Sequence, residues 1–502
     1  MPNSVKEIKD WQDHVIRPEE VDKYLENGKD FINDEGINLF LTDQKKTDSQ
    51  KVRAIIQKSL AVETLDPIET AALLNIDDRD LWEEVFQAAR AIKTKVYDNR
   101  VVTFAPLYCS SLCVNNCAYC GFRQENQLIK RRRLSIQEVR QEAEVLAGKL
   151  GHKRLILVCG EHPSSDAEYI SEVMREIYSV KVNTRCGTGQ IRRINVNAAP
   201  MSIDDLKKIK SAGIGTFQVF QETYHHKTYQ SVHPENTIKG NFSWRLYAQH
   251  RAMEAGIDDV AIGALFGLYD WKFEVMGLLY HARDLEKKFG IGPHTISFPR
   301  IEMAANTSFV HNTGHATSDD DFKKLVAVLR LAIPYAGLIV TCREKPQMIR
   351  QVIPMCTQRD ASSRIGIGAY SDRSEEQEAR RQQFILGDSR SLDEVIQELA
   401  AMGYITSFCT AGYRCGRTGD NIMSMLKSGK EGCFCKLNAV LTFQEWLEDF
   451  ASLETKKIGE AIISREISQI QERILKDFSP EIFKKFTEYH NKIKEGERDL
   501  CF

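Results

Sequence analysis

Three cysteines separated by three and by two residues stand in the segment Cys113-Val-Asn-Asn-Cys117-Ala-Tyr-Cys120. Thiolates are the protein ligands of iron–sulfur clusters, and one loop with this spacing can supply three corners of a four-iron cluster. The fourth iron then stays open to a substrate or a cofactor. A zinc ion held by the same three thiolates and one distant ligand is the alternative that the spacing leaves.

Charged residues that could act with such a centre come at or next to the ends of apolar runs. They are Glu161, Glu222, Arg300 and Arg343. A planar guanidinium at Arg343 can bind a substrate carboxylate through two parallel hydrogen bonds. A salt bridge between Arg343 and the adjacent Glu344, at the rim of the site, is the alternative.

Eight short apolar or β-branched runs follow one another from residue 101, and helical patterns lie between them. The predicted strands cover 101–108, 154–160, 192–198, 216–223, 259–267, 294–300, 338–344 and 364–370. Strands that alternate with amphipathic helices are typical of an α/β fold with a parallel sheet. Eight such units predict a (β/α)8 TIM-type barrel, with a doubly wound open sheet as the competitor. In a barrel the candidate residues meet at the carboxyl ends of the strands, where barrel enzymes keep their active sites.

The barrel is expected to be one of three units. Residues 1–98 show the periodicity of amphipathic helices and no evident chemistry, so we expect an N-terminal helical region that packs on the next unit. Residues 99–375 form the barrel. Residues 376–502 begin with a charge-rich connector and continue as a cysteine-containing helical extension.

The 502-residue chain contains 68 Lys and Arg against 70 Asp and Glu, for a net charge of −2. This balance predicts no nucleic-acid partner and no electrostatic membrane binding. The N-terminus is polar and no apolar run is long enough to span a bilayer, so we expect a cytoplasmic protein without a secretory signal. The 13 cysteines of such a chain indicate metal or redox chemistry rather than a disulfide scaffold.

The C-x3-C-x2-C loop after the first strand of a barrel resembles the radical S-adenosylmethionine (SAM) superfamily. The resemblance implies a [4Fe–4S] cluster on Cys113, Cys117 and Cys120, whose open iron binds the amino and carboxylate groups of SAM and whose electron cleaves SAM to a 5′-deoxyadenosyl radical. It also implies a set of contacts around SAM. They are Tyr119 and Phe122 at the adenine, Gly160 and Glu161 at the methionyl ammonium, Glu222 as a second carboxylate, Gly263 and Gly267 where the backbone approaches adenine, and Arg300 at the SAM carboxylate.

Segments such as GIGTFQVFQETYH and FKKLVAVLRLAIPYAG resemble, more narrowly, the aromatic-amino-acid lyase branch. The likeness is greatest to the [FeFe]-hydrogenase maturase tyrosine lyases (HydG), with the 2-iminoacetate synthases (ThiH) as cousins. These families cleave the Cα–Cβ bond of L-tyrosine to p-cresol and dehydroglycine. The resemblance implies this reaction, a ferredoxin or flavodoxin as electron donor, a role in hydrogenase maturation, and Arg343, Glu222 and Tyr119 as catalytic residues. Asn195, Asn197 and the segment 366–370 are further expected to line the pocket.

The C-terminal region resembles the part of the maturases that holds a second cluster on C-x2-C-x22-C, with one departure. Cys409 and Cys435 occupy the first and third positions, whereas Gly412 replaces the middle cysteine. Because glycine cannot ligate iron, either Cys415 or Cys433 supplies the third thiolate, or the second cluster is altered or lost. We expect a degenerate site that is empty or holds a substitute metal. The maturases also place a histidine beside that cluster, for which the candidates are His281 and, behind it, His294.

Two other functions are consistent with the residues. Residues 300–321 depart from the family pattern, so a lyase of the same branch that acts on a different amino acid is the first alternative. A non-catalytic iron–sulfur or zinc carrier for cluster assembly is the second. Binding of SAM separates the carrier from both enzymes, because a scaffold needs neither Glu161 nor a glycine-rich fifth strand.

Overall fold

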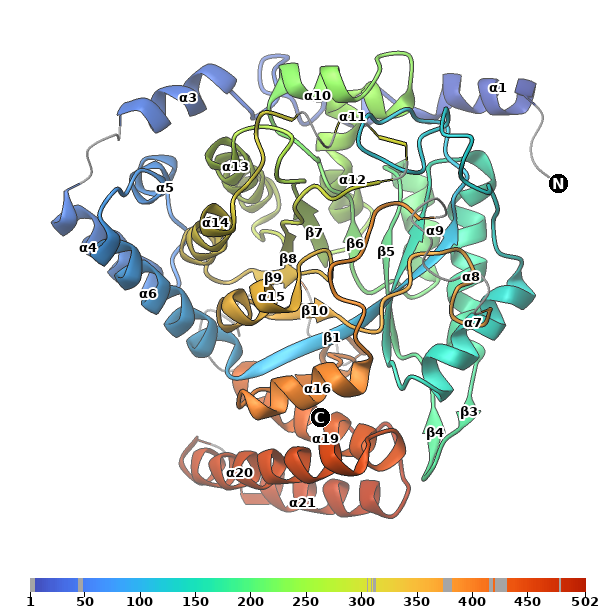
Figure 1. The fold of residues 1–502 in the computed structure, drawn as a ribbon, viewed down its shortest axis with the longest axis vertical. Helices are drawn as coiled ribbons and strands as arrows, with labels where there is room; N and C mark the ends of the chain where they lie inside the picture. The colour runs from blue at the N-terminus through green and yellow to red at the C-terminus, as the bar shows by residue number, and fades with distance from the viewer. Residues whose placement is uncertain are drawn as a thin grey trace.

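The computed structural model describes residues 5–43, 48–304, 306–307, 309, 313–372, 382–414, 419, 431–477 and 480–502. Parallel strands form a closed barrel at its centre (Figure 1). In order around the barrel they are β1 (Arg100–Ser110), β2 (Arg154–Cys159), β5 (Arg193–Asn197), β6 (Phe217–Gln218), β7 (Val260–Gly263), β8 (Thr295–Ser297), β9 (Gly337–Val340) and β10 (Gln358–Asp360). Because β10 also pairs with β1, the sheet closes. The predicted (β/α)8 barrel is confirmed over the open sheet.

The eighth strand is the one that the sequence prediction misplaced. The alternation in 364–370 predicts a strand, but these residues form turns, with Gly368 at φ +77°. The strand is Gln358–Asp360, whose polar side chains are buried and carry no apolar signal. Ile365 and Ile367 are also buried, which produced the misleading alternation.

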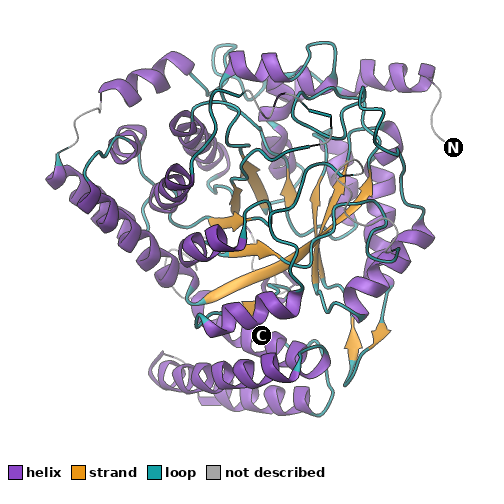
Figure 2. Cartoon of the chain, in the orientation of Figure 1, coloured by secondary structure: helices purple, strands orange, loops and turns teal. Residues whose placement is uncertain are grey.

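Helices surround the barrel on its outer side (Figure 2). They include α7 (Ile136–Gly148), α8 (Ala167–Ser179), α9 (Ile203–Ser211), α12 (Ala248–Glu254), α13 (Trp271–Phe289), α14 (Asp319–Ala332) and α15 (Pro346–Val352). Helix α13, which the functional site depends on, begins where the Asp270 side chain accepts from two backbone amides and ends at Gly290 in the left-handed conformation. An aspartate at the N-cap is a common start signal of a helix, and a left-handed glycine is a common stop signal.

The N-terminal helices pack against the outer helix layer. They include α3 (Asp34–Asp43), α4 (Ser49–Leu60), α5 (Pro67–Leu74) and α6 (Arg79–Tyr97), and α6 packs along α14. Asp66 and Glu69 form a capping box in front of α5, as the Asp-Pro-x-Glu pattern predicts.

The C-terminal helices lie at the amino end of the barrel (Figure 1). They are α19 (Glu431–Asp449), α20 (Leu453–Asp477) and α21 (Pro480–Lys494), and β11 (Ile405–Ser407) pairs with the start of β1 beside them. Buried Glu445 of α19 binds Lys153 over 3.0 Å and Arg192 over 2.8 Å. The division at residues 98 and 375 stays a prediction. Among the described residues, no helix is long and apolar enough to cross a membrane.

Candidate active site

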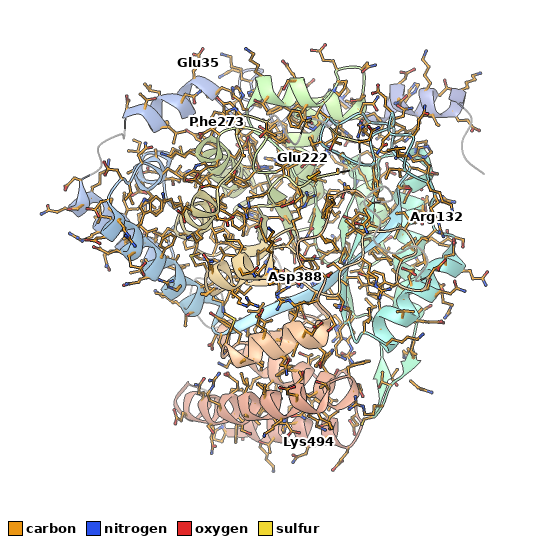
Figure 3. The ribbon with its side chains drawn as sticks, in the orientation of Figure 1. Glu35, Arg132, Glu222, Phe273, Asp388 and Lys494 are labelled. Atoms are coloured by element: carbon orange, nitrogen blue, oxygen red, sulfur yellow. The ribbon has the colours of Figure 1, made fainter. Side chains whose placement is uncertain are left out.

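A cavity of about 230 Å³ lies at the carboxyl ends of the strands. The predicted site residues that line it are Cys113, Cys117, Tyr119, Cys120, Phe122, Gly160, Glu161, Asn197, Glu222 and Arg343. Apolar walls come from Phe104, Ile156, Phe220, Ile339 and Phe384. Figure 3 labels Glu222, which lies in the interior of the molecule among the loops that follow the strands. The three predicted cluster thiols, Glu161, Glu222 and Arg343 thus line one cavity with apolar walls.

The three cysteines lie on a loop that follows β1 and is tied to the end of β2. The Val114 amide donates to the Glu161 carbonyl over 2.9 Å, and the Gly160 amide donates to the Ser110 carbonyl over 3.0 Å. A Cβ atom at Gly160 would lie 2.3 Å from the carbonyl oxygen of Leu112. Only glycine therefore permits the cluster loop to approach β2 this closely.

Arg131 fixes the other end of the cysteine loop. Its guanidinium donates to the carbonyl oxygens of Ser111 and Phe122, each over 2.7 Å, and also to that of Arg123. The half-buried Arg131 side chain thereby binds three backbone carbonyl groups at the two ends of the cysteine loop. Contacts within the protein thus hold the loop that carries the cysteines.

Cys117 is buried, Cys113 and Cys120 are partly exposed, and the three thiols influence one another. Burial raises the pKa of the Cys117 thiol to about 12, and the charges of Cys120 and Cys113 act in the same direction. The Phe122 amide lies 3.4 Å from Cys120 Sγ, and Gln383 Nε2 lies 3.7 Å from it. Such N–H donors tune the potential of a cluster sulfur. Within the described ranges no three His, Cys, Asp or Glu side chains converge on a single metal ion, a convergence that a cluster with one thiolate per iron does not require.

Glu161 presents an unsatisfied oxygen to the site. Asn115 Nδ2 donates to Glu161 Oε2 over 2.5 Å, and Asn115 Oδ1 accepts from the Lys239 amide over 3.0 Å. Oxygen Oε1 of Glu161 is buried and has no hydrogen-bond partner in the described part of the chain. Burial raises the pKa of this carboxyl. A buried oxygen of this kind costs free energy unless a ligand donor satisfies it.

Glu222 is held in an unusual backbone conformation next to two cations. Its φ is +71°, in the left-handed region. Lys239 Nζ lies 2.8 Å and Arg245 Nη2 3.2 Å from Glu222 Oε1. Burial alone would raise the pKa of Glu222, but Lys239 and Arg245 outweigh it and hold the pKa below its ordinary value. The carboxylate is therefore ionised at neutral pH.

Tyr119 is fixed by a histidine that follows the fourth barrel strand. Its hydroxyl lies 2.8 Å from His233 Nε2, while His233 Nδ1 lies 3.0 Å from the Tyr229 carbonyl oxygen. Since a carbonyl can only accept, Nδ1 carries the proton and Tyr119 donates to Nε2. Lys239 Nζ lies 5.5 Å from the centre of the Tyr119 ring. Tyr119 is thus oriented by its neighbours and not by a ligand.

Arg343 enters the cavity from the end of β9 with its charge uncompensated. Its guanidinium lies 3.4 Å from the ring centre of Phe384. In the portion of the chain that the structure describes, it makes no ion pair or hydrogen bond, because the neighbouring Glu344 pairs with Arg300 instead. Burial lowers the pKa of Arg343, although the nearby charges of Glu222 and Glu302 act in the opposite direction. The salt bridge with Glu344, which the sequence left as the alternative, is not formed.

Arg300 and two glycines lie outside the cavity lining. Arg300 pairs with Glu344 and Asp319, the latter over 2.8 Å. Its contact with the SAM carboxylate stays a prediction. Gly263 and Gly267 also lie outside the cavity lining. A Cβ at Gly263 would lie 2.6 Å from the Phe220 ring, and Gly267 has φ +109°, so packing and backbone conformation account for both.

Only one of the two asparagines of β5 lines the cavity. Asn197 lines the cavity. Asn195 is fully buried deeper in the barrel, where its Oδ1 accepts from the Thr216 amide over 3.1 Å. Of the segment 366–370, none lines the cavity, although Ile365 just before it does.

Two of the C-terminal cysteines lie near each other at the amino end of the barrel. Cys409, at φ +47°, has its Sγ 3.7 Å from Arg193 Nη1. Cys409 and Cys435 both act electrostatically on Tyr97. Cys415 lies outside the described residues, and Cys433 belongs to helix α19.

The two candidate histidines lie in different surroundings. His281 Nδ1 lies 2.9 Å from the Tyr224 hydroxyl, and its ring packs on Phe31 at 5.3 Å, on the outer side of the barrel. No described contact links it to the C-terminal cysteines. His294 instead interacts with Asp259, which pairs with Arg193 beside Cys409.

Several cavity residues escaped sequence reasoning. They are Asn115, Lys239, Arg245, Glu302 and Gln383. Asn115 stands between the cysteines and could have been found from that position. The other four come from loops and a helix without a motif, so only the fold brings them to the site.

Comparison with known proteins provides the family context. Residues 107–276 match the model of the radical SAM superfamily, and residues 297–405 match that of the Biotin and Thiamin Synthesis associated domain. The 2-iminoacetate synthase of Salmonella typhimurium is 29% identical over 355 residues, which cover 70% of this chain and 89% of that protein. Among solved structures, HydG, a maturase of the [FeFe]-hydrogenase, is 46% identical with a TM-score of 0.88, over 94% of this chain and 100% of that chain. HydG from Carboxydothermus hydrogenoformans is 37% identical with a TM-score of 0.73, over 92% and 96%.

Proposed function

The chain belongs to the radical SAM superfamily, in the branch that contains HydG and 2-iminoacetate synthase, and from this premise we propose that it is a lyase that cleaves the Cα–Cβ bond of L-tyrosine. The products are p-cresol and dehydroglycine. The reaction uses a [4Fe–4S] cluster, SAM, and an electron donor such as a ferredoxin or a flavodoxin.

The observation that carries this proposal is the uncompensated guanidinium of Arg343. It shares one cavity with the three cysteines and stands on the face of Phe384. An arginine in a dry chamber gains most from a ligand that brings a planar anion, and the carboxylate of an amino acid matches its two-pronged geometry. The stacked Phe384 restricts the guanidinium to one plane, so it also orients the amino acid that binds it.

The residues present fit the cluster and SAM. Cys113, Cys117 and Cys120 lie on one braced loop and supply three iron ligands. The unsatisfied Oε1 of Glu161 matches an ammonium donor such as that of the methionyl group. When bound, the cluster and SAM supply an electron and a 5′-deoxyadenosyl radical that abstracts hydrogen from the substrate.

The chain's own residues bind, orient and exclude water. Glu222 stays ionised beside its two cations and offers its second oxygen to SAM. Tyr119 and Phe122 give flat apolar surfaces next to the cysteines, against which an adenine can stack. The apolar walls exclude water from the cavity and so limit side reactions of a reactive radical.

A maturase role depends on the C-terminal site, which we propose to be degenerate. Cys409 and Cys435 provide two thiolates, and Gly412 removes the third that the family pattern expects. Two thiolates fall short of the three that a four-iron cluster with one open iron takes from the protein, so the site holds no stable cluster of this kind. His294, rather than His281, is the histidine proposed beside this site.

The test is anaerobic reconstitution with iron and sulfide, followed by incubation with SAM, dithionite and a panel of aromatic amino acids. We expect p-cresol and 5′-deoxyadenosine with tyrosine alone. Cleavage of another amino acid would establish the same-branch alternative, which the unusual residues 300–321 favour. If the protein neither binds nor cleaves SAM, the result would support the non-catalytic cluster carrier instead.

A further inference from the structure

The left-handed backbone of Glu222 needs an explanation in the surrounding structure. A non-glycine residue at φ +71° is strained and persists only where its neighbours hold it in place. On one side the backbone is pinned to the extension of β7, because the Leu265 amide donates to the Glu222 carbonyl over 2.7 Å and the Gln221 amide donates to that of Gly263 over 3.0 Å. The other side meets helix α13.

Helix α13 grips the two residues that follow Glu222 at three points. The buried carboxyl of Glu274 accepts from the Thr223 hydroxyl and, over 2.9 Å, from the Tyr224 amide. A Cβ at Gly277 would lie 2.4 Å from the Tyr224 ring, so this glycine makes room for the ring. His281 Nδ1 lies 2.9 Å from the Tyr224 hydroxyl.

The three gripping residues form one face of the helix. Glu274, Gly277 and His281 are spaced by three and four residues, which places them on successive turns of the same side. They hold Tyr224 by its amide, its ring and its hydroxyl. Because Tyr224 cannot shift, the peptide before it cannot relax, and Glu222 stays in the left-handed region. Figure 3 labels Glu222 and Phe273, the α13 residue next to Glu274.

We propose that Glu274 and His281 are positioning residues that aim the Glu222 carboxylate at SAM through Thr223 and Tyr224. The inference rests on the proposed function, in which Glu222 contacts SAM. It also gives His281 a role in place of the metal ligation expected from the sequence. The strain at Glu222 then has a purpose, because it turns the side chain toward Lys239 and Arg245 and into the cavity.

The decisive pair of variants is Glu274→Leu and Glu274→Gln. Burial raises the pKa of Glu274 to about 8, so at pH 7 the carboxyl is mostly neutral. A glutamine keeps both contacts, because its oxygen can accept from the Tyr224 amide and its NH2 group can donate to the Thr223 hydroxyl oxygen. We expect Glu274→Leu to raise KM for SAM about 10- to 100-fold, as loss of an outer-shell partner does at metal sites. Glu274→Gln should restore KM to within about threefold of the parent. Iron content and the spectrum of the reduced cluster without SAM should be unchanged in both.

The Tyr224–His281 bond is tested by a double-mutant cycle. Tyr224→Phe and His281→Phe remove the two ends of one hydrogen bond, so the double variant should raise KM for SAM no more than either single variant. Tyr280→Phe, on the same helix but without a described contact to Tyr224, is the matched control and should leave KM unchanged. This cycle also decides the question if Glu274→Leu does not fold.

The outcomes separate the two proposals. If Glu222→Gln leaves KM for SAM unchanged, the role of Glu222 in the proposed function is wrong. If Glu222→Gln raises KM but Glu274→Leu does not, or if the effects of Tyr224→Phe and His281→Phe add, Glu222 binds SAM without help from α13 and the positioning inference is overturned.

Discussion

The close approach of the cluster loop to β2 makes Gly160→Ala a sharp test of how the first cluster is held. A Cβ there would lie 2.3 Å from the Leu112 carbonyl oxygen and 3.2 Å from Cys113 Cβ. Ordinary contacts begin near ~3.5 Å, so the loop would have to retreat by about 1 Å. Overpacking of this size costs about 1–3 kcal/mol. The retreat also moves Cys113 relative to Cys117 and Cys120, and a misplacement of about 1 Å can cost about 100-fold in rate.

The assay is iron and sulfide content after anaerobic reconstitution, together with the rate of reductive SAM cleavage. We expect Gly160→Ala to fold but to lose most of its cluster or its SAM cleavage. Gly36→Ala is the matched control, since the atoms nearest its Cβ belong to the exposed side chain of Asn33, 3.1 Å away, which can rotate aside. A Gly160→Ala protein with full iron content and the parent rate would refute the view that this glycine sets the position of the cluster loop.

Four further outcomes are expected. Replacing all three loop cysteines by alanine should abolish formation of 5′-deoxyadenosine; persistence of that product would reject them as cluster ligands. Arg343→Lys should lose p-cresol while SAM cleavage continues uncoupled, because a bidentate clamp contributes about 2–3 kcal/mol; p-cresol at the parent rate would locate the carboxylate elsewhere. Reconstituted protein should hold about four irons per chain, whereas eight, falling in Cys415→Ser, would show that a second cluster survives. Burial acts to lower the pKa of His226, but hydrogen bonds to Asp30 and Asp34 outweigh burial and raise the pKa to about 9. The protonated His226 therefore stabilises the fold fully below about pH 6.5, and this contribution is lost as the pH rises through 9. Chemical denaturation between these pH values should show the loss of stability, and His226→Gln should make the stability less dependent on pH over the same range.

Much of the barrel could be predicted because its signals are local. A strand buried on both faces reads as an apolar run, and the cysteine loop is defined by spacing along the chain alone. β10 was missed for a related reason, since Gln358, Arg359 and Asp360 are polar although all three are buried. Arg359 pairs with Asp388, and Asp360 accepts from the Ser363 hydroxyl. A strand whose buried side chains are polar has no alternation of apolar residues, so its sequence does not predict a strand.

The roles of individual charges were less predictable because they depend on which partner is nearer in space. Arg300 and Arg343 both follow apolar runs, and each has Glu344 within reach along the chain or across the loop. The structure gives Glu344 to Arg300, which leaves Arg343 for the cavity. Lys239 and Arg245 were missed because no sequence motif near them indicates their ion pairs with Glu222.

The N-terminal region acquires a function through the helix that it covers. Phe31 packs on His281 at 5.3 Å between ring centres, and Arg283 donates to the Leu65 carbonyl over 3.0 Å. These contacts hold α13 on one side, while His281 contacts Tyr224 on the other. A helix that holds a strained residue must itself resist displacement, since about 1–3 kcal/mol of stored strain would otherwise relax by moving the helix. Residues without chemistry of their own thereby stabilise the conformation of an acid in the active site.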